Sequence, residues 1–203
     1  GRSWAGHVIE RAAPRRLGDL QDDYFTTEMW HETGAQRDGT IRRETGFVDV
    51  PDEFVLSGPH IFVGNPLHKT PRSVCASNKA YDVIGLDAIL DDYVPRSNYR
   101  PACDRVTYES RLPVVSWQET ESDQQRLSTA YWRVAERRGT HPADERSVRP
   151  VVIPPGPAHI GGIFSVVLRD QTLVVSTAGY WASLPFDFLV RVSGKQDFRD
   201  ATA

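Results

Sequence analysis

Ile163-Phe164-Ser165-Val166-Val167-Leu168 is a run of β-branched and aromatic residues, a composition that favours a β-strand. It overlaps the most apolar part of the chain, residues 160–167, which is far too short to cross a bilayer. Upstream, residues 148–154 have a similar character and predict a second strand, and residues 173–176 are a candidate third strand. Residues 186–192 are apolar with polar flanks and fit either a strand or a helix.

The first half of the chain is dominated by turn signals. Between residues 24 and 72, pairs such as Thr33-Gly34 and Asp38-Gly39 separate short apolar runs, the pattern of short strands joined by loops. Residues 91–101 form a second loop-rich stretch, which its prolines keep extended.

Residues 121–138 predict one amphipathic helix. Its features are an N-cap at Ser122 or Asp123, a stop at Gly139, and apolar residues at helical spacing at Leu127, Ala130, Tyr131 and Val134. The expected fold is therefore α+β, with more strand than helix. Residues 1–23 are expected to be an arm from a preceding domain. Residues 24–203 are expected to form the main domain, in which this helix joins two sub-lobes at 24–116 and 140–200.

The composition is that of a globular protein, with 39% hydrophobic, 10% aromatic and 25% charged residues. A net charge of −3 argues against a protein that coats nucleic acid, but arginines cluster locally, with six between residues 126 and 149 against three acids. Cys75 and Cys103 have no neighbouring His cluster and are interpreted as buried thiols. Together with the lack of a signal peptide pattern, this predicts a cytoplasmic protein without a membrane partner.

Signatures of common enzymes are absent from the sequence. It contains no glycine-rich nucleotide-binding fingerprint, no phosphate-binding loop and no nucleophile elbow. The acidic pairs Asp22-Asp23, Asp52-Glu53 and Asp91-Asp92 fit solvated turns better than a metal-dependent nuclease, which stays open as a third hypothesis. We therefore expect no catalytic residue, metal or cofactor within these residues.

Several segments resemble blocks of large single-chain adenine-specific DNA methyltransferases, of the type IIG restriction-modification class and of the DISARM and BREX phage-defence systems. These segments are residues 30–33, 41–45, 58–72, 91–99, 145–156 and 182–191. The last is similar to a signature near the end of many target-recognition domains, although Ala182 stands where an Asn is common. The resemblance covers about residues 24–200.

The resemblance implies that this chain is the target-recognition domain, which reads double-stranded DNA. A catalytic methyltransferase domain that binds S-adenosylmethionine would lie N-terminal to it in the same parent chain, so this part would not be catalytic alone. Base-reading candidates lie mainly on two loops, because Arg, Lys, Asn and Gln can pair with base edges in the major groove. They are Arg42, Arg43, Asn65, His68, Lys69, Arg72, Arg96, Asn98, Tyr99 and Arg100. Candidates for phosphate contact are Arg133, Arg137, Arg138 and Lys195.

Structural roles compete with these assignments. Arg191 is expected to pair with Asp187 at helical spacing, and His60 and His159 to be satisfied histidines near the core. Packing roles are expected for Tyr131, Trp132, Trp181 and Phe186. The alternative function is a protein-interaction module that docks the methyltransferase onto other subunits of a defence complex.

Overall fold

The structure is a computed structural model and describes residues 17–61, 68–118, 126–139, 144–194 and 196–198. It combines helices with open sheets, which confirms the expected α+β class. Among the described residues the largest sheet is antiparallel, with strands in the order β1 (Tyr24–Thr27), β10 (Ile163–Leu168), β7 (Arg133–Arg137) and β8 (Val151–Ile153).

Strand β10 lies at the centre of this sheet and is buried along its whole length. Phe164, Val166 and Leu168 contact one hydrophobic cluster, whereas Ile163 and Val167 belong to clusters on the opposite face. This alternation follows from the two-residue period of a strand. The predicted strands at 163–168 and 148–154 are confirmed, the second over the shorter range of β8.

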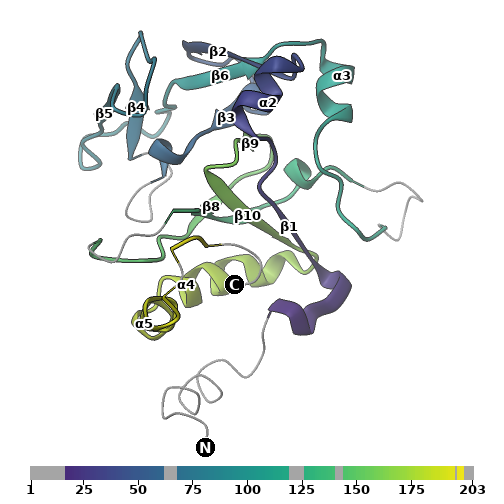
Figure 1. The fold of residues 1–203 in the computed structure, drawn as a ribbon, viewed down its shortest axis with the longest axis vertical. Coiled ribbons are helices and arrows are strands. Elements are labelled where there is room, and N and C mark those ends of the chain that lie inside the picture. Colours follow the sequence, from purple (N-terminus) through teal and green to yellow (C-terminus); the bar gives the residue numbers. More distant parts are fainter. Residues whose placement is uncertain (1–16, 62–67, 119–125, 140–143, 195, 199–203) are drawn as a thin grey trace, which may run out of the picture.

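Helices α4 (Val174–Trp181) and α5 (Leu184–Val192) cover one face of the sheet (Figure 1). Residues 186–192 are helical because Ser183 accepts a capping hydrogen bond from the amide of Phe186 at 3.3 Å and Pro185 suits the first turn. Trp181 and Phe186 are buried, as predicted. The candidate strand at 173–176 is wrong, because these residues end the 3₁₀ turn η5 (Gln171–Leu173) and begin α4.

In the part of the chain that the structure describes, no single helix has the length and apolarity needed to cross a membrane. One bent pair, Gln171–Trp181 and Leu184–Val192 at 66°, meets both criteria together.

A lobe of short elements lies over the other end of the molecule, in the upper half of Figure 1. Its parallel pair joins β3 (Val55–Leu56) to β9 (Ala158–His159), so segments far apart in the sequence meet there. The remaining elements of the lobe are α2 (Glu32–Arg37), β2 (Ile41–Gly46), η2 (Pro51–Glu53), η3 (Gly58–His60), β4 (Lys69–Pro71), β5 (Tyr81–Val83), β6 (Ser97–Pro101), α3 (Arg105–Ser110) and η4 (Ser128–Ala130). Before β1, the 3₁₀ helix η1 (Leu17–Asp23) packs against the α4–α5 cluster.

The predicted helix at 121–138 is wrong over residues 126–138, and its predicted N-cap, Ser122 or Asp123, lies outside the described residues. After the single turn η4, residues 133–137 form β7, which pairs with both β10 and β8. The apolar spacing that suggested a helix is therefore overridden by pairing on both sides of the strand. Tyr131 is buried as predicted, but Trp132 is 49% exposed and does not pack in the core. The two sub-lobes stay a prediction, but the segment between them contributes a strand.

Candidate nucleic-acid interface

The β2–β6 ribbon carries several of the predicted contact residues. In its antiparallel register Arg42 lies opposite Arg100, so the two side chains share one face of the ribbon. Glu44 pairs with Arg42 at 2.6 Å and with Arg100 at 3.6 Å. The hydrogen bond from Arg42 lowers the pKa of the Glu44 carboxyl below its ordinary value. This face therefore presents two guanidinium groups around one carboxylate.

Arg43 lies on the opposite face of the ribbon and holds neighbouring elements together. Its guanidinium contacts the carboxylate of Glu32 at 2.5 Å, the hydroxyl of Tyr99 at 2.8 Å and the carbonyl of Ala76 at 2.9 Å. The Tyr99 hydroxyl donates a hydrogen bond to the same Glu32 carboxylate. Arg43 thus fixes α2 and the loop between β4 and β5 against the ribbon.

The β4–β5 hairpin lies beside this ribbon. The amide of Arg96 donates to the hydroxyl of Thr70 at 3.0 Å, and its guanidinium donates to the carbonyl of Pro71 at 3.4 Å. Arg72 is exposed and pairs with Asp82 across the hairpin at 2.8 Å. His68 and Lys69 are half-buried at the start of the hairpin, where burial lowers the pKa of His68.

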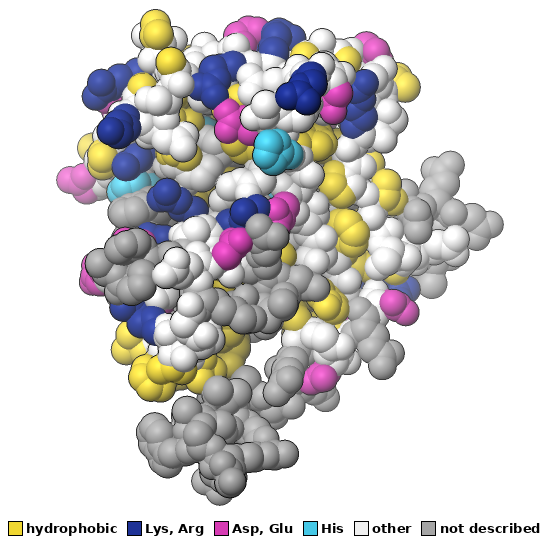
Figure 2. Space-filling model, viewed as in Figure 1, with side chains coloured by type: hydrophobic (Ala, Val, Ile, Leu, Met, Phe, Trp, Pro, Cys, Tyr) yellow, Lys and Arg dark blue, Asp and Glu magenta, His cyan; other side chains and the backbone are white. Residues whose placement is uncertain are grey.

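The structure therefore brings six predicted cations into one lobe: Arg42, Arg43, Lys69, Arg72, Arg96 and Arg100. Figure 2 shows Lys and Arg side chains gathered over the upper part of the visible face, with acidic side chains between them. We call this set the upper-lobe cations.

His60 positions the backbone of Arg96. The amide of Ser57 donates to Nδ1 at 3.0 Å, and Nε2 lies 2.9 Å from the carbonyl of Arg96. An amide can only donate and a carbonyl can only accept, so His60 is neutral with its proton on Nε2. Complete burial lowers the pKa of His60 to about 4. The predicted near-core role of His60 is confirmed.

Phe47 is a feature that the sequence analysis missed. Its ring is 57% exposed, and the guanidinium of Arg96 lies over it, 5.0 Å from the ring centroid. The guanidinium of Arg100 donates a hydrogen bond to the backbone carbonyl of Phe47. An exposed aromatic ring next to arginines is a surface on which a base or sugar can stack. The position of Phe47 directly after Gly46, a few residues beyond Arg42 and Arg43, is the signal that could have identified it.

Three residues that were predicted to contact DNA are buried instead: Asn98, Tyr99 and Arg133. Asn98 and Tyr99 are each 2% exposed, and Asn98 accepts a hydrogen bond from Thr45. Arg133 is fully buried and donates to the carbonyls of Pro154, at 3.4 Å, and Pro157. Arg133 lies in the segment that the sequence predicts as a helix, but it belongs to β7, where it is the first of four consecutive buried residues, and burial lowers its pKa to about 10. None of the three offers its side chain to a nucleic acid.

A polar hollow of about 780 Å³ separates the upper lobe from the end of the central sheet. Its lining includes His31, Glu32 and Asn78 from the upper lobe, and Arg137 and Arg138 at the end of β7. Arg138 is held by Glu28 at 2.5 Å and by Asp197 at 2.9 Å. Within the described ranges Arg137 forms no hydrogen bond or ion pair through its side chain, so its guanidinium is available to a ligand in the hollow.

Two candidates, Asn65 and Lys195, lie outside the described residues. Among the residues that the structure does describe, no group of three or more His, Cys, Asp or Glu side chains is arranged to hold a metal ion. Cys75 is a buried thiol as predicted, whereas Cys103 is only partly buried.

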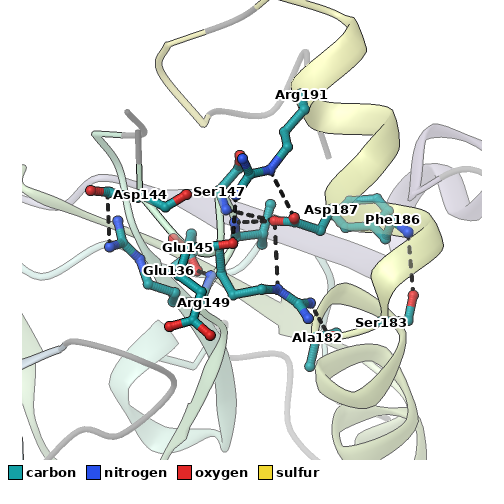
Figure 3. A network of polar contacts seen from close by, with 12 residues as sticks. Glu136, Asp144, Glu145, Ser147, Arg149, Ala182, Ser183, Phe186, Asp187 and Arg191 are labelled. Atoms are coloured by element: carbon teal, nitrogen blue, oxygen red, sulfur yellow. Dashed lines mark hydrogen bonds and ion pairs between the residues drawn. The ribbon is translucent and has the colours of Figure 1, made fainter. Parts of the chain in front are cut away.

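The segment that resembles the terminal signature of recognition domains has a structural role (Figure 3). Asp187 on α5 accepts hydrogen bonds from the amides of Ser147 at 2.6 Å and Val148 at 3.1 Å, and pairs with Arg191 at 3.0 Å. Burial would raise the pKa of Asp187, but these donors outweigh it and lower the pKa. Arg191 also donates to the carbonyl of Glu145 at 2.6 Å. The predicted Asp187–Arg191 pair is confirmed.

Glu136 belongs to the same region and is fully buried (Figure 3). One carboxylate oxygen accepts a hydrogen bond at 2.5 Å from the amide of Arg149, while the other has no hydrogen-bond partner among the described residues. Burial raises the pKa of Glu136 to about 8. The carboxyl is therefore largely protonated near neutral pH.

Glu136→Gln is expected to make the protein more stable than the wild type as pH rises. A raised pKa in the folded state contributes stability that is fully present below pH 4.5 and is lost as pH rises through about 8. Glutamine keeps an oxygen that can accept from the amide of Arg149 but does not titrate. Between pH 4.5 and about 8, the free energy of unfolding of the variant should therefore rise relative to that of the wild type by up to about 1.4 kcal/mol per pH unit. Urea unfolding at pH 5, 6, 7 and 8 measures the difference. A difference that stays constant with pH would contradict the assignment.

No protein-family model matches the chain, and no curated protein or solved structure shows significant similarity to it.

Proposed function

We propose that this chain binds duplex DNA through the upper-lobe cations other than Arg43, and through the polar hollow between this lobe and the end of the central sheet. The observation that carries the proposal is the convergence of six predicted cations from β2, β4, β6 and their flanking residues onto one lobe. Arg137 and Arg138 line the hollow together with Asn78 and His31. Neutralisation of phosphates by Lys and Arg supplies most of the affinity of such a surface.

The ion pairs on this lobe do not prevent phosphate binding. Arg42 and Arg72 pair with Glu44 and Asp82, and all four side chains are about half exposed. Exposed ion pairs contribute only about 0–1 kcal/mol, so a phosphate can replace the carboxylate at small cost. The carboxylates also weaken non-specific binding to DNA. This favours a protein that recognises a particular DNA sequence over one that covers nucleic acid regardless of sequence.

The polar hollow is lined by side chains that can form hydrogen bonds with DNA bases. Its lining offers an amide at Asn78, an imidazole at His31 and a guanidinium at Arg137. Arg pairs with guanine and Asn with adenine in the major groove, and each good bidentate contact gives about 1–3 kcal/mol of discrimination. The resemblance described above supports the further proposal that this DNA is the target of an N6-adenine methyltransferase, whose S-adenosylmethionine-dependent domain belongs to the same parent protein.

The proposal predicts salt-dependent binding of a fluorescein-labelled duplex, measured by fluorescence anisotropy between about 50 and 200 mM salt. Arg42→Ala and Arg72→Ala should each weaken binding and reduce the slope of log K against log salt concentration by about 0.9 per lost phosphate contact. Arg169→Ala is the matched control, because Arg169 is an exposed arginine paired with Asp23 outside the upper lobe. Absence of duplex binding at low salt, or an equal loss in Arg169→Ala, would favour the docking alternative.

A further inference from the structure

Helix α5 carries apolar side chains around most of its circumference. On its inner side, Phe186 and Val190 are buried in the cluster that covers the central sheet. On its outer side, Leu184, Phe188 and Val192 are 71%, 48% and 52% exposed. A surface helix usually has a polar outer face, whereas a helix that is apolar all round is usually buried on every side. The outer face of α5 therefore has the composition of a buried surface.

The two charged residues of α5 do not make this outer face polar. Asp187 is only 5% exposed and accepts hydrogen bonds from two backbone amides of the loop before β8. Arg191 contacts the same loop, because its guanidinium pairs with Asp187 at 3.0 Å and donates to the carbonyl of Glu145 at 2.6 Å. Both charges are thus engaged within the chain.

The three exposed residues form a continuous apolar ridge. They are spaced four residues apart, so they lie on the same face over about two turns of the helix. We call Leu184, Phe188 and Val192 the α5 stripe. Figure 2 shows hydrophobic side chains gathered at the place where Figure 1 shows α5. Ridges of this spacing pack into the grooves between equal ridges of another helix, so a helix with the same spacing is the complementary surface.

A second copy of this chain offers such a helix in its own α5. If two α5 helices pair antiparallel about a twofold axis at Phe188, Leu184 of each copy lies opposite Val192 of the other. Arg191 then lies opposite Pro185 and the helix dipoles run in opposite directions. In a parallel pair, the two Arg191 side chains would lie next to each other and repel. The charges therefore favour the antiparallel pair.

We propose that two copies of this chain associate through the α5 stripe, antiparallel and about a twofold axis at Phe188. The stripe lies on the helices that cover the sheet and not on the upper lobe, so the proposal does not depend on DNA binding (Figure 1). It offers on the order of 300 Å² of apolar surface per copy, whereas a stable interface buries roughly 800 Å² per partner. The dimer is therefore weak and forms at high protein concentration.

Sedimentation velocity of the full chain between about 10 µM and 0.5 mM tests the association. The sedimentation coefficient should rise with concentration toward that of a dimer. Phe188→Asp should lower the association constant at least tenfold, because it places two carboxylates at the twofold axis. Val106→Asp is the matched control, since Val106 is 78% exposed on α3, and it should leave the association constant unchanged.

Cysteine substitutions test the antiparallel arrangement. Phe188→Cys should form a disulfide between two copies under mild oxidation, identified by mass spectrometry of the linked peptides. Leu184→Cys mixed with Val192→Cys should cross-link at least tenfold faster than Leu184→Cys by itself. A chain that stays monomeric up to about 0.5 mM, or a dimer that Phe188→Asp leaves intact, would overturn the proposal. Equal cross-linking of Leu184→Cys with itself and with Val192→Cys would also overturn it.

Discussion

Asp187→Ala is expected to destabilise the protein by roughly 3–5 kcal/mol, because it removes one acceptor that serves several buried donors. The amides of Ser147 and Val148 would lose their acceptor, and Arg191 would lose its ion pair. These contacts attach residues 144–149 to α5, so their loss releases a loop as well as a helix. Urea unfolding at pH 7, followed by tryptophan fluorescence, measures the change.

Asp170→Ala is the matched control, because Asp170 caps η5 through Thr172 but is exposed to solvent. It should destabilise the protein much less than Asp187→Ala. Asp187→Asn keeps an oxygen that can accept from the two amides. Its stability should therefore lie between those of Asp187→Ala and Asp170→Ala. If all three variants unfold at the same urea concentration, Asp187 does not have the role assigned to it.

Acidification is expected to destabilise the wild type, because two buried histidines must remain neutral in the folded state. Burial lowers the pKa of His60 to about 4 and that of His159 to about 3. For a pKa lowered in the folded state, stability is present above the unfolded value near 6.5 and is lost as pH falls through the folded value. Each histidine contributes about 1.4 kcal/mol per pH unit in this window.

Glu136 opposes the histidines, because its raised pKa stabilises the fold as pH falls from about 8 to 4.5. Between about pH 6.5 and 4.5 the wild type should therefore lose about 1.4 kcal/mol per pH unit, and Glu136→Gln about twice as much. Unfolding curves at several pH values for both proteins measure the two slopes. Equal slopes, or imidazole resonances of His60 and His159 that titrate near pH 6.5, would contradict this account.

Local composition was sufficient to predict the strongest strands but not the pairing that organises them. The run from Ile163 to Leu168 is strand-like by itself and became the central strand. Residues 133–136 are all buried because β10 and β8 lie on both sides of them, and this pairing is not visible in a helical spacing of apolar residues. The packing role predicted for Trp132 was wrong for the same reason, because Trp132 was assigned to this helix but is exposed.

The candidate site was partly predictable from residue type. Arg42, Arg72 and Arg100 lie on one lobe because Arg42 and Arg100 belong to paired strands and Arg72 directly follows β4, a strand of the hairpin beside them. The burial of Asn98 and Tyr99 depends on α2 and on the core beneath β6, which the linear sequence does not reveal. Asn78 and the polar hollow also required the fold, since their lining comes from segments throughout the chain.

The parallel pairing of β3 with β9 has a consequence for how the protein is made. Val55 lies opposite Ala158, and the amide of Gly161 donates to the carbonyl of Trp30 at 2.7 Å. A ribosome must therefore synthesise most of the chain before the upper lobe can close around these partners. Contacts between residues so distant in sequence slow folding and leave early segments exposed to misassociation. Val55 and Leu56 consequently stay without their strand partner until Ala158 and His159 have been synthesised.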